Sequence, residues 1–336
     1  MKAVVLTQTS PIETRPLQTT TLPDPCPKDS EILVEVSVCG VCHTDLDEVE
    51  GQLAPARLPI VLGHQVVGKV ADKGKAVTGH RLGDRVGVTW LYWSCGCCEF
   101  CKAGLENLCG RAKWTGKDAD GGYAEYMVVS QDFAHPIPAI YVDSQAAPLL
   151  CAGVIGYRAI RLSDIHNGET VGLFGFGSSA HIVIQMIRHR FPDSPIFVFT
   201  RSDAHKQLAK NLGAAWAGSP GQNPPAMIKK AIDFTPIGES VCHALATLDK
   251  AGRLVINAIR KTTPISPLDY AGHLWHEKEV KSVANVTRRD VEEFLPLAGE
   301  IPIIPKVTEF DLDQANDALL AVKHASLQGA AVLRTR

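Results

Sequence analysis

The apolar positions along the chain form two different patterns. Up to about Leu150, short apolar runs such as EILVEVSV, DRVGVTWLYW and YAEYMVV are interrupted by Gly and Pro, which predicts irregular β structure. After Cys151, short continuous runs such as TVGLFGFG, PIFVFT and RLVINAI are separated by helix-like stretches. Runs of this kind are typical of strands buried in a parallel sheet. The sequence therefore predicts a β-rich unit followed by an α/β unit.

One internal segment and the end of the chain carry further patterns. In NLGAAWAGSPGQNPPAMIKKAIDF, a Gly and Pro break precedes a helix-like run, which predicts another crossover in the parallel sheet. The segment FDLDQANDALLAVKHASLQGAAVLRTR predicts a helix followed by a terminal strand, but its composition does not tell which unit it joins. A chain of 336 residues fits about two domains.

Composition narrows the classes of partner. Apolar residues make up 45% of the chain and charged residues 21%, and the formal net charge is -2. Because there is no basic surplus to attract nucleic acid or anionic lipid, we expect neither nucleic acid nor membrane as a partner. The N-terminus MKAVVLTQTSPIETRP lacks an apolar core of signal-peptide length, and no apolar stretch reaches the length of a bilayer span. These features predict a cytoplasmic protein.

Ten cysteines in a chain of this length predict metal-binding thiols in a reducing compartment rather than a disulfide framework. In SCGCCEFCKAGLENLC, four of them can surround one tetrahedral zinc and leave no open position, which predicts a structural site. Using Cys97 in place of the second ligand would leave intervals of one and three residues. A Cys-rich redox loop is the alternative. The four predicted ligands, with two, two and seven residues between them, are Cys95, Cys98, Cys101 and Cys109.

Two further cysteines and a histidine can form a second zinc site. Cys42 lies in CGVCHTDLDEVEG, His64 in VLGHQVVG and Cys151 in APLLCAG. Taken alone, each reads as a core or structural residue. Together they supply three ligands, which leaves one position of a tetrahedral zinc open for an alcohol whose hydroxyl pKa the metal would lower. We therefore expect two zinc ions per chain, one catalytic and one structural.

A glycine-rich turn follows the first strand of the α/β half. TVGLFGFGSSAHIVIQMI places Gly175, Gly177 and Ala180 in the pattern G-x-G-x-x-A. The first Gly permits the tight turn, the second lets the backbone approach a pyrophosphate, and the small third residue allows close packing of the helix. The helix N-terminus would then face the phosphates. The pattern predicts a dinucleotide-binding turn, with an ordinary strand-to-helix connection as the alternative.

The next strand, PIFVFT, ends without an acidic residue. Thr200, Arg201 and Ser202 stand where an NAD enzyme usually places an Asp or Glu on the ribose hydroxyls. The missing carboxylate removes repulsion against a 2′-phosphate, and Arg201 can pair with that phosphate. The sequence therefore favours NADP over NAD, and a solvated loop arginine is the alternative.

These motifs resemble the zinc-dependent medium-chain alcohol dehydrogenases, whose pattern runs GVCHTDLH, then GHE, then a Cys before the dinucleotide domain. The resemblance covers the whole chain. It implies that Cys42, His64 and Cys151 hold the catalytic zinc. It also implies that Thr44 hydrogen-bonds the reacting alcohol through its hydroxyl, and that Asp45 orients His64 through the remote ring nitrogen.

The same resemblance marks two departures and three further candidates. Gln65 stands where the family has Glu after the ligand histidine, and this loss of a charge is expected to make the zinc more electrophilic. Asp47 stands where the family ends its proton relay with a histidine, and is expected to accept the relayed proton. By resemblance, His43 and Arg288 approach the cofactor phosphates and Trp90 lines the substrate pocket. The alternatives are an exposed loop histidine, a surface salt-bridged arginine and a core or interface tryptophan.

The resemblance implies a fold of class α/β plus β. A GroES-like catalytic domain would span residues 1–151, a Rossmann NAD(P)-binding domain 152–287, and the segment 288–336 would return to the catalytic domain. The implied activity is reversible hydride transfer between a primary or secondary alcohol and NAD(P), with an aldehyde or ketone as the other substrate. We expect a homodimer or homotetramer. The alternatives are a dehydrogenase for a specialised polyol or cinnamyl-type alcohol, and a non-catalytic zinc- and nucleotide-binding relative.

Overall fold

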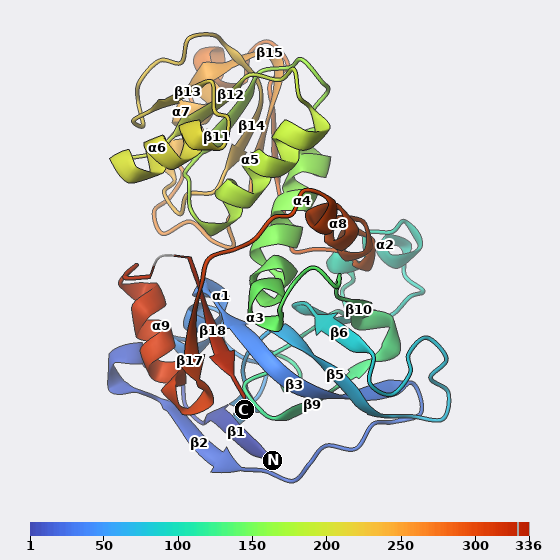
Figure 1. Ribbon diagram of the computed structural model, residues 1–336. Coiled ribbons are helices and arrows are strands. Elements are labelled where there is room, and N and C mark those ends of the chain that lie inside the picture. The colour runs from blue at the N-terminus through green and yellow to red at the C-terminus, as the bar shows by residue number, and fades with distance from the viewer. Residues whose placement is uncertain (328, 336) are drawn as a thin grey trace. The chain divides into compact units, whose positions relative to one another are not determined.

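The computed structural model describes residues 1–327 and 329–335. Internal contacts divide the chain into two compact units (Figure 1). Unit 1 comprises Met1–Cys151 and Asn285–Arg336, and unit 2 comprises Ala152–Ala284. Unit 1 is mainly β and unit 2 is α/β, so the two patterns of apolar positions in the sequence correspond to two kinds of structure.

The strands of unit 1 form three sheets. The largest has the order β10-β6-β5-β3-β18-β17, with β9 paired to β3. A three-stranded sheet has the order β2-β1-β4, and β7 pairs with β8. The strands are β1 (Lys2–Leu6), β2 (Leu17–Thr21), β3 (Glu31–Val41), β4 (Ile60–Val61), β5 (Gln65–Lys73), β6 (Arg85–Val88), β7 (Leu91–Trp93), β8 (Lys113–Trp114), β9 (Tyr126–Ser130), β10 (Ala134–Pro136), β17 (Val307–Asp311) and β18 (Ala330–Arg334).

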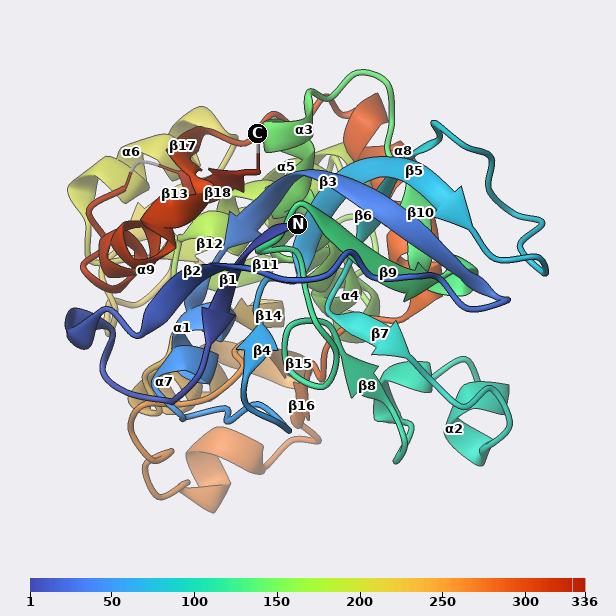
Figure 2. The same cartoon turned by 90° about the horizontal axis from the view of Figure 1, so that it is seen from below.

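Strand β3 organises the core of unit 1. Its burial alternates along EILVEVSV, as expected of a strand with one face on the core, and Ile32, Val34 and Val36 are almost fully buried. Figure 2 shows β3 with β5 and β9 beside it, and both pairings are antiparallel. The strand ends at Val41, so the sheet fixes the position of Cys42, which follows directly.

The last segment of the chain belongs to unit 1. Strand β18 pairs antiparallel with β3, with Ala331 opposite Val41, and the Thr335 hydroxyl donates to the Ser37 carbonyl at 3.2 Å. The predicted helix and terminal strand are confirmed as α9 and β18. The helices of unit 1 are η1 (Ile12–Thr14), α1 (His43–Val49), α2 (Glu99–Lys102), η2 (Glu106–Leu108), η3 (Gln131–Phe133), α3 (Asp143–Ala146), η4 (Ala147–Leu150), α8 (Arg288–Glu300), η6 (Leu312–Gln314) and α9 (Ala315–Lys323).

Unit 2 is built on one parallel sheet. Its strand order, β13-β12-β11-β14-β15-β16, is that of a Rossmann fold, which confirms the predicted fold class. Within the described residues, no helix combines the length and the apolar character needed to cross a membrane. The elements are α4 (Ala152–Ser163), β11 (Val171–Phe174), α5 (Ser178–Arg190), β12 (Ile196–Phe199), α6 (Asp203–Asn211), β13 (Trp216–Gly218), β14 (Ile228–Asp233), α7 (Glu239–Thr247), β15 (Leu248–Ile256), η5 (Tyr270–Leu274) and β16 (Glu279–Ser282).

The helix expected within AMIKKAIDF is wrong. Residues Ile228–Asp233 form strand β14, which lies between β11 and β15. Ile228, Ala231 and Ile232 are fully buried, because a central strand of a parallel sheet is covered on both faces. Ile228, Ala231 and Ile232 stand at positions i, i+3 and i+4, which is also the spacing of one face of a helix, so the period of this short segment did not indicate a strand.

A buried histidine in unit 1 makes the stability of the protein depend on pH. Burial first, and then the charges of Arg288 and His80, lower the pKa of His135 to about 3. Since an exposed histidine in the unfolded chain titrates near 6.5, stability is lost as pH falls below that value. For His135→Gln, we expect the loss of unfolding free energy between pH 7 and pH 5 to shrink by about 2 kcal/mol.

Denaturant unfolding of both proteins at the two pH values measures this difference. Proton binding by metal-ligand thiols affects both proteins equally, so it cancels from the comparison. Equal losses in the wild type and the variant would show that His135 does not carry the effect.

Candidate metal centres and cofactor loop

The first turn of helix α1 brings together the residues of the open metal site. Cys42 caps the helix: its Sγ accepts from the Thr44 backbone N–H at 3.4 Å, and its own N–H donates to Asp45 Oδ2 at 2.8 Å. The other carboxylate oxygen, Asp45 Oδ1, lies 3.1 Å from His64 Nδ1. This capping box leaves the Asp45 carboxylate with one oxygen on the backbone and one on the imidazole.

The imidazole of His64 is consequently aimed at the cysteines. With Nδ1 held by Asp45, the ring presents Nε2 to Cys42 Sγ at 3.6 Å. The ligand atoms of Cys42, His64 and Cys151 all lie within 4.8 Å of one another. Two sulfurs and one imidazole nitrogen converging in this way suit a zinc ion with one open position, and the carboxylate behind the histidine would set its tautomer.

The electrostatics of this site resist deprotonation of its sulfur and nitrogen atoms. The hydrogen bond with Cys151, and next burial, raise the pKa of Cys42 well above its usual range. Burial alone would lower the pKa of His64, but the charges of Asp45 and Cys42 outweigh it and raise that pKa. Both shifts favour the protonated forms of these groups. A divalent cation would displace these protons, so metal affinity at this site should rise with pH.

The second cluster lies on the loop around α2. The Sγ atoms of four cysteines lie within 4.8 Å of one another, and α2 begins directly after the second of them. Backbone N–H groups point at the sulfurs: that of Cys98 lies 3.4 Å from Cys95 Sγ, and that of Arg111 lies 3.4 Å from Cys109 Sγ. Such donors suit thiolate ligands. The set is the one that the sequence predicted, Cys95, Cys98, Cys101 and Cys109.

The fifth cysteine of this loop stands outside the set. Cys97 is exposed, its Sγ lies 3.7 Å from that of Cys95, and it accepts from Arg111 Nη2 at 3.2 Å. The backbone N–H of Cys97, the Arg111 side chain and the Cys98 N–H lower the pKa of Cys95 to about 5. A sulfur that is already a thiolate near neutral pH is prepared to bind a metal.

The residues around the open site differ in exposure. Thr44 and Asp47 on α1 are buried, whereas His43 is exposed. Gln65 is also buried, and a Cβ on Gly40 would come within 2.7 Å of its Oε1, so the glycine is what makes room for this side chain. The roles assigned to these side chains by sequence stay predictions.

Trp90 lies beside the open site. Its ring centroid is 6.0 Å from that of His64, with an interplanar angle of 50°, and 5.1 Å from that of Trp114. Sequence reasoning placed Trp90 near the substrate but missed a neighbour, Glu48, which is fully buried on α1. Its spacing of three residues from Asp45 puts both acids on one side of the helix, but this spacing did not indicate that Glu48 is buried.

Arg288 forms an ion pair with Glu106, which is far away in the sequence. Its guanidinium donates to both carboxylate oxygens of Glu106 at 2.8 to 3.1 Å, and its backbone N–H also donates to Glu106 at 2.7 Å. The guanidinium carbon lies 4.9 Å from the ring centre of Phe133. Sequence reasoning missed Glu106, and the expected contact of Arg288 with cofactor phosphates stays a prediction.

The predicted dinucleotide turn lies between β11 and α5 in unit 2. Gly175 has φ +85°, a left-handed conformation that favours glycine, and Gly177 caps the 13-residue helix α5. A Cβ on Gly177 would meet nothing within 4 Å, so space is open in front of the helix N-terminus, whereas Ala180 is fully buried. An open space at a helix N-terminus behind a tight glycine turn fits a pyrophosphate.

The end of β12 carries the residues predicted to contact the ribose. Thr200 is buried, while Arg201 is exposed. Ser202 is the N-cap of α6, and its hydroxyl accepts from the His205 N–H at 3.3 Å. The Ser202 hydroxyl is therefore already used to cap α6. Arg201 is an exposed cation at the end of this strand.

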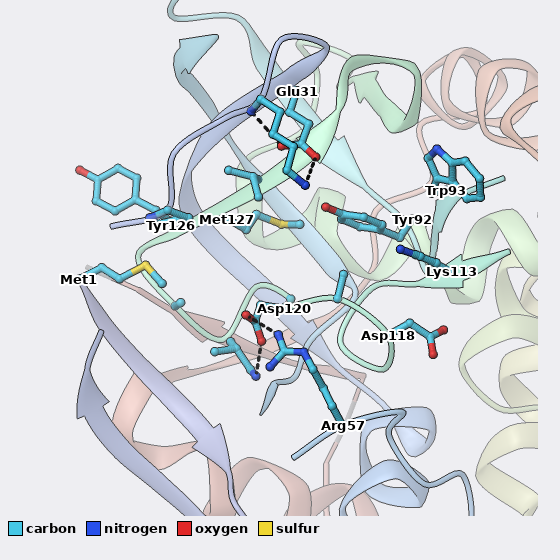
Figure 3. Close-up of a pocket in the computed structure, with 17 residues that line it drawn as sticks. Met1, Glu31, Arg57, Tyr92, Trp93, Lys113, Asp118, Asp120, Tyr126 and Met127 are labelled. Carbon is cyan, nitrogen blue, oxygen red and sulfur yellow. Dashed lines mark hydrogen bonds and ion pairs between the residues drawn. The ribbon is translucent and has the colours of Figure 1, made fainter. Parts of the chain in front are cut away.

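A separate cavity of about 490 Å³ lies in unit 1, and Figure 3 shows it. Its lining residues include Tyr92, Trp93 and Lys113 but none of the seven predicted metal ligands. The Arg57 guanidinium pairs with Asp120 at 2.8 Å. This cavity is therefore distinct from the open metal site.

The geometry agrees with what comparisons with known proteins find. Residues 28–139 match the family described as the alcohol dehydrogenase GroES-like domain. The chain is 43% identical over 338 residues to a probable alcohol dehydrogenase, AdhA, of Mycobacterium tuberculosis (strain CDC 1551 / Oshkosh), with 99% of this chain and 97% of the relative covered. The chain belongs to the zinc-dependent medium-chain alcohol dehydrogenases.

Other members of this family are more distant. An alcohol dehydrogenase of Geobacillus stearothermophilus is 31% identical over 319 residues, which cover 92% of this chain and 93% of the relative. Among solved structures, an NAD-dependent alcohol dehydrogenase superposes with a TM-score of 0.90 at 24% identity, with both chains fully covered. That structural likeness concerns the fold, and it agrees with a GroES-like unit and a Rossmann unit in one dehydrogenase chain.

Proposed function

We propose that this alcohol dehydrogenase oxidises small alcohols to aldehydes or ketones, and catalyses the reverse reduction, at a zinc ion held by Cys42, His64 and Cys151. The observation that carries the proposal is the arrangement of these three ligand atoms within 4.8 Å, with Asp45 behind His64. A set with three protein ligands keeps one position for substrate. The Cys95 cluster would hold a second, structural zinc.

Each protein group at the open site would then have a defined task. When bound, the zinc supplies a Lewis acid that lowers the pKa of an alcohol hydroxyl. Thr44 Oγ1 would take up the hydroxyl proton and pass it on, and the Asp47 carboxylate on the same helix would receive it. Asp45, bound to His64 Nδ1, would keep Nε2 of His64 available to the metal. Burial of Thr44 and Asp47 supports a relay shielded from bulk water.

Zinc analysis and turnover test the proposal together. We would measure zinc per chain and the alcohol-dependent formation of NADPH and NADH, with a panel of primary and secondary alcohols. Two zinc ions per chain with turnover support the proposal. One zinc ion per chain and no turnover with either cofactor would favour a binding protein that has kept only the fold.

The cofactor is proposed to be NADP rather than NAD. Arg201 is exposed at the end of β12, and no acid is present at positions 200 to 202 to repel a 2′-phosphate. For Arg201→Ala we expect the KM for NADP⁺ to rise about tenfold, since one charge-assisted contact to phosphate is lost, while the KM for NAD⁺ changes little. Steady-state kinetics with both cofactors measure this.

Lys210→Ala, which removes another exposed cation from α6, is the matched control and should change neither KM. Equal increases for NADP⁺ and NAD⁺ in Arg201→Ala would contradict the assignment. So would tenfold tighter binding of NAD⁺ than NADP⁺ by the wild type.

We also propose that the protein is a homodimer or homotetramer, as the sequence led us to expect. The supporting observation is an edge strand of the parallel sheet with exposed apolar side chains on it and nearby in the sequence. Strand β16 ends the strand order, and Val280 on it is exposed. Tyr270 and Trp275 nearby in the sequence are 63% and 54% exposed. An open edge strand, with exposed aromatic rings nearby in the sequence, favours pairing with a second copy of the chain.

A further inference from the structure

A buried acid on α1 lacks the hydrogen bonds that its environment requires. Glu48 is fully buried, and neither of its carboxyl oxygens has a hydrogen-bond partner among the described residues. Burial first, and then the charge of Asp45, raise the pKa of Glu48 well above the usual range of a glutamate, although His64, the Trp90 indole and Lys117 act in the opposite direction. A buried carboxyl without partners is costly, so it calls for a functional explanation.

A second buried polar atom lacks a partner in the same region. The indole Nε1 of Trp90 is buried and makes no hydrogen bond in the described structure, although the Trp90 side chain as a whole is only half-buried. An indole N–H can only donate, and a carboxyl oxygen can accept. Because the Trp90 indole acts on the pKa of Glu48, the two groups are near neighbours.

The position of Trp90 connects this pair to the open metal site. The centroid of the Trp90 ring lies 6.0 Å from that of His64 and 5.1 Å from that of Trp114. The Nε1 atom is buried whereas the Trp90 side chain as a whole is half-buried, so the exposed part of the indole is another part of the ring. Rotation of this ring would change the size of the space beside His64.

We propose that Glu48 is a positioning residue that pairs with the Trp90 indole N–H and thereby fixes the wall that selects alcohols by size. Only the statement about alcohols rests on the proposed function. The pairing unites a donor and an acceptor that are otherwise buried without partners, which favours one orientation of the ring over its rotated alternatives. Glu48 itself acts through Trp90 and takes no part in the proton relay.

Indole NMR tests the pairing without reference to activity. In protein labelled with ¹⁵N-tryptophan, five indole N–H signals are expected from five tryptophans, and Trp90→Phe identifies the signal of Trp90 by its absence. Glu48→Leu should move that signal upfield, since a hydrogen bond is lost, whereas Glu48→Gln keeps an acceptor oxygen and should move it less. Glu48→Ala replaces Glu48→Leu if leucine does not fit.

Kinetics test the consequence for substrate choice. Zinc analysis should give the wild-type value for every variant, which excludes an effect through loss of metal. In Glu48→Leu, the ratio of kcat/KM for a small primary alcohol to that for a branched one should change about tenfold, mainly through KM, with Glu48→Gln close to the wild type. In the Trp90→Phe background, Glu48→Leu should add no further change.

The failures of the two proposals can be told apart. An unmoved Trp90 signal in a folded, zinc-loaded Glu48→Leu or Glu48→Ala protein would overturn the pairing. Additive effects of Glu48→Leu and Trp90→Phe on the alcohol ratio would overturn the positioning role. Absence of alcohol turnover in the wild type would instead count against the proposed function, while the indole spectrum would still decide whether Glu48 and Trp90 pair.

Discussion

Replacement of Cys151 by serine is expected to lower kcat/KM for alcohol oxidation by about a thousandfold or more. A serine hydroxyl is a poor zinc ligand, so the open site would lose one of its three protein ligands and with it the metal. The Lewis acid contributes several kcal/mol to the reaction, and each 1.36 kcal/mol corresponds to about a tenfold change in rate. Cys151 suits the test better than Cys42, because Cys42 also caps α1.

Metal analysis and steady-state kinetics measure this result. Zinc should fall by one equivalent per chain, and the melting temperature should change less than when the other cluster is disrupted. Cys242→Ser is the matched control, since Cys242 is also a free thiol with little exposure but lies far from either cluster in sequence. A Cys151→Ser protein that keeps its zinc and its activity would remove Cys151 from the ligand set.

Replacement of Cys101 by serine is expected to lower the stability of the protein much more than its activity. The closed set has no position for substrate, so its metal would stabilise the loop around α2 rather than react. If about 4 kcal/mol of stabilisation is lost, the melting temperature should fall by roughly 10 °C, while kcat measured well below that temperature should stay within a few-fold of the wild type. Calorimetry, zinc analysis and kinetics at low temperature measure the three quantities.

Cys97→Ser offers a close control for this prediction. Cys97 lies on the same loop, its sulfur is 3.7 Å from that of Cys95, and it is outside the set of four. The Cys97→Ser protein should therefore keep its zinc and its melting temperature. If Cys97→Ser lost zinc and Cys101→Ser kept it, the assignment of ligands within the loop would be wrong.

The two candidate metal sites were not equally predictable from the sequence. The four cysteines of the closed set lie within a single loop, so their spacing along the chain limits their spacing in space. The open set draws on residues more than a hundred positions apart, and sequence spacing alone says little about their distance. The resemblance to a known family singled them out, and the fold brings their ligand atoms within 4.8 Å.

Some features could not be predicted because they depend on packing between distant segments. The contact of Arg288 with Glu106 joins residues 182 positions apart. In AMIKKAIDF, Ile228, Ala231 and Ile232 have the spacing of one face of a helix, and only the pairing with β11 and β15 makes the segment a strand. Burial of Glu48 likewise follows from what packs over α1, and its own sequence context, DLDEVEG, looks like that of a solvated acid.

The sequence by itself determined the fold class, the set of four clustered cysteines and the glycine-rich turn after β11, because each depends on local period or on short spacing. Only the tertiary structure decided which nitrogen of His64 is presented to the cysteines, since that depends on the capping box that holds Asp45. It also decided that Glu48 and the Trp90 indole N–H are buried near each other. A hydrogen-bond partner is chosen by position in space, and position in space is set by the packing of the whole unit.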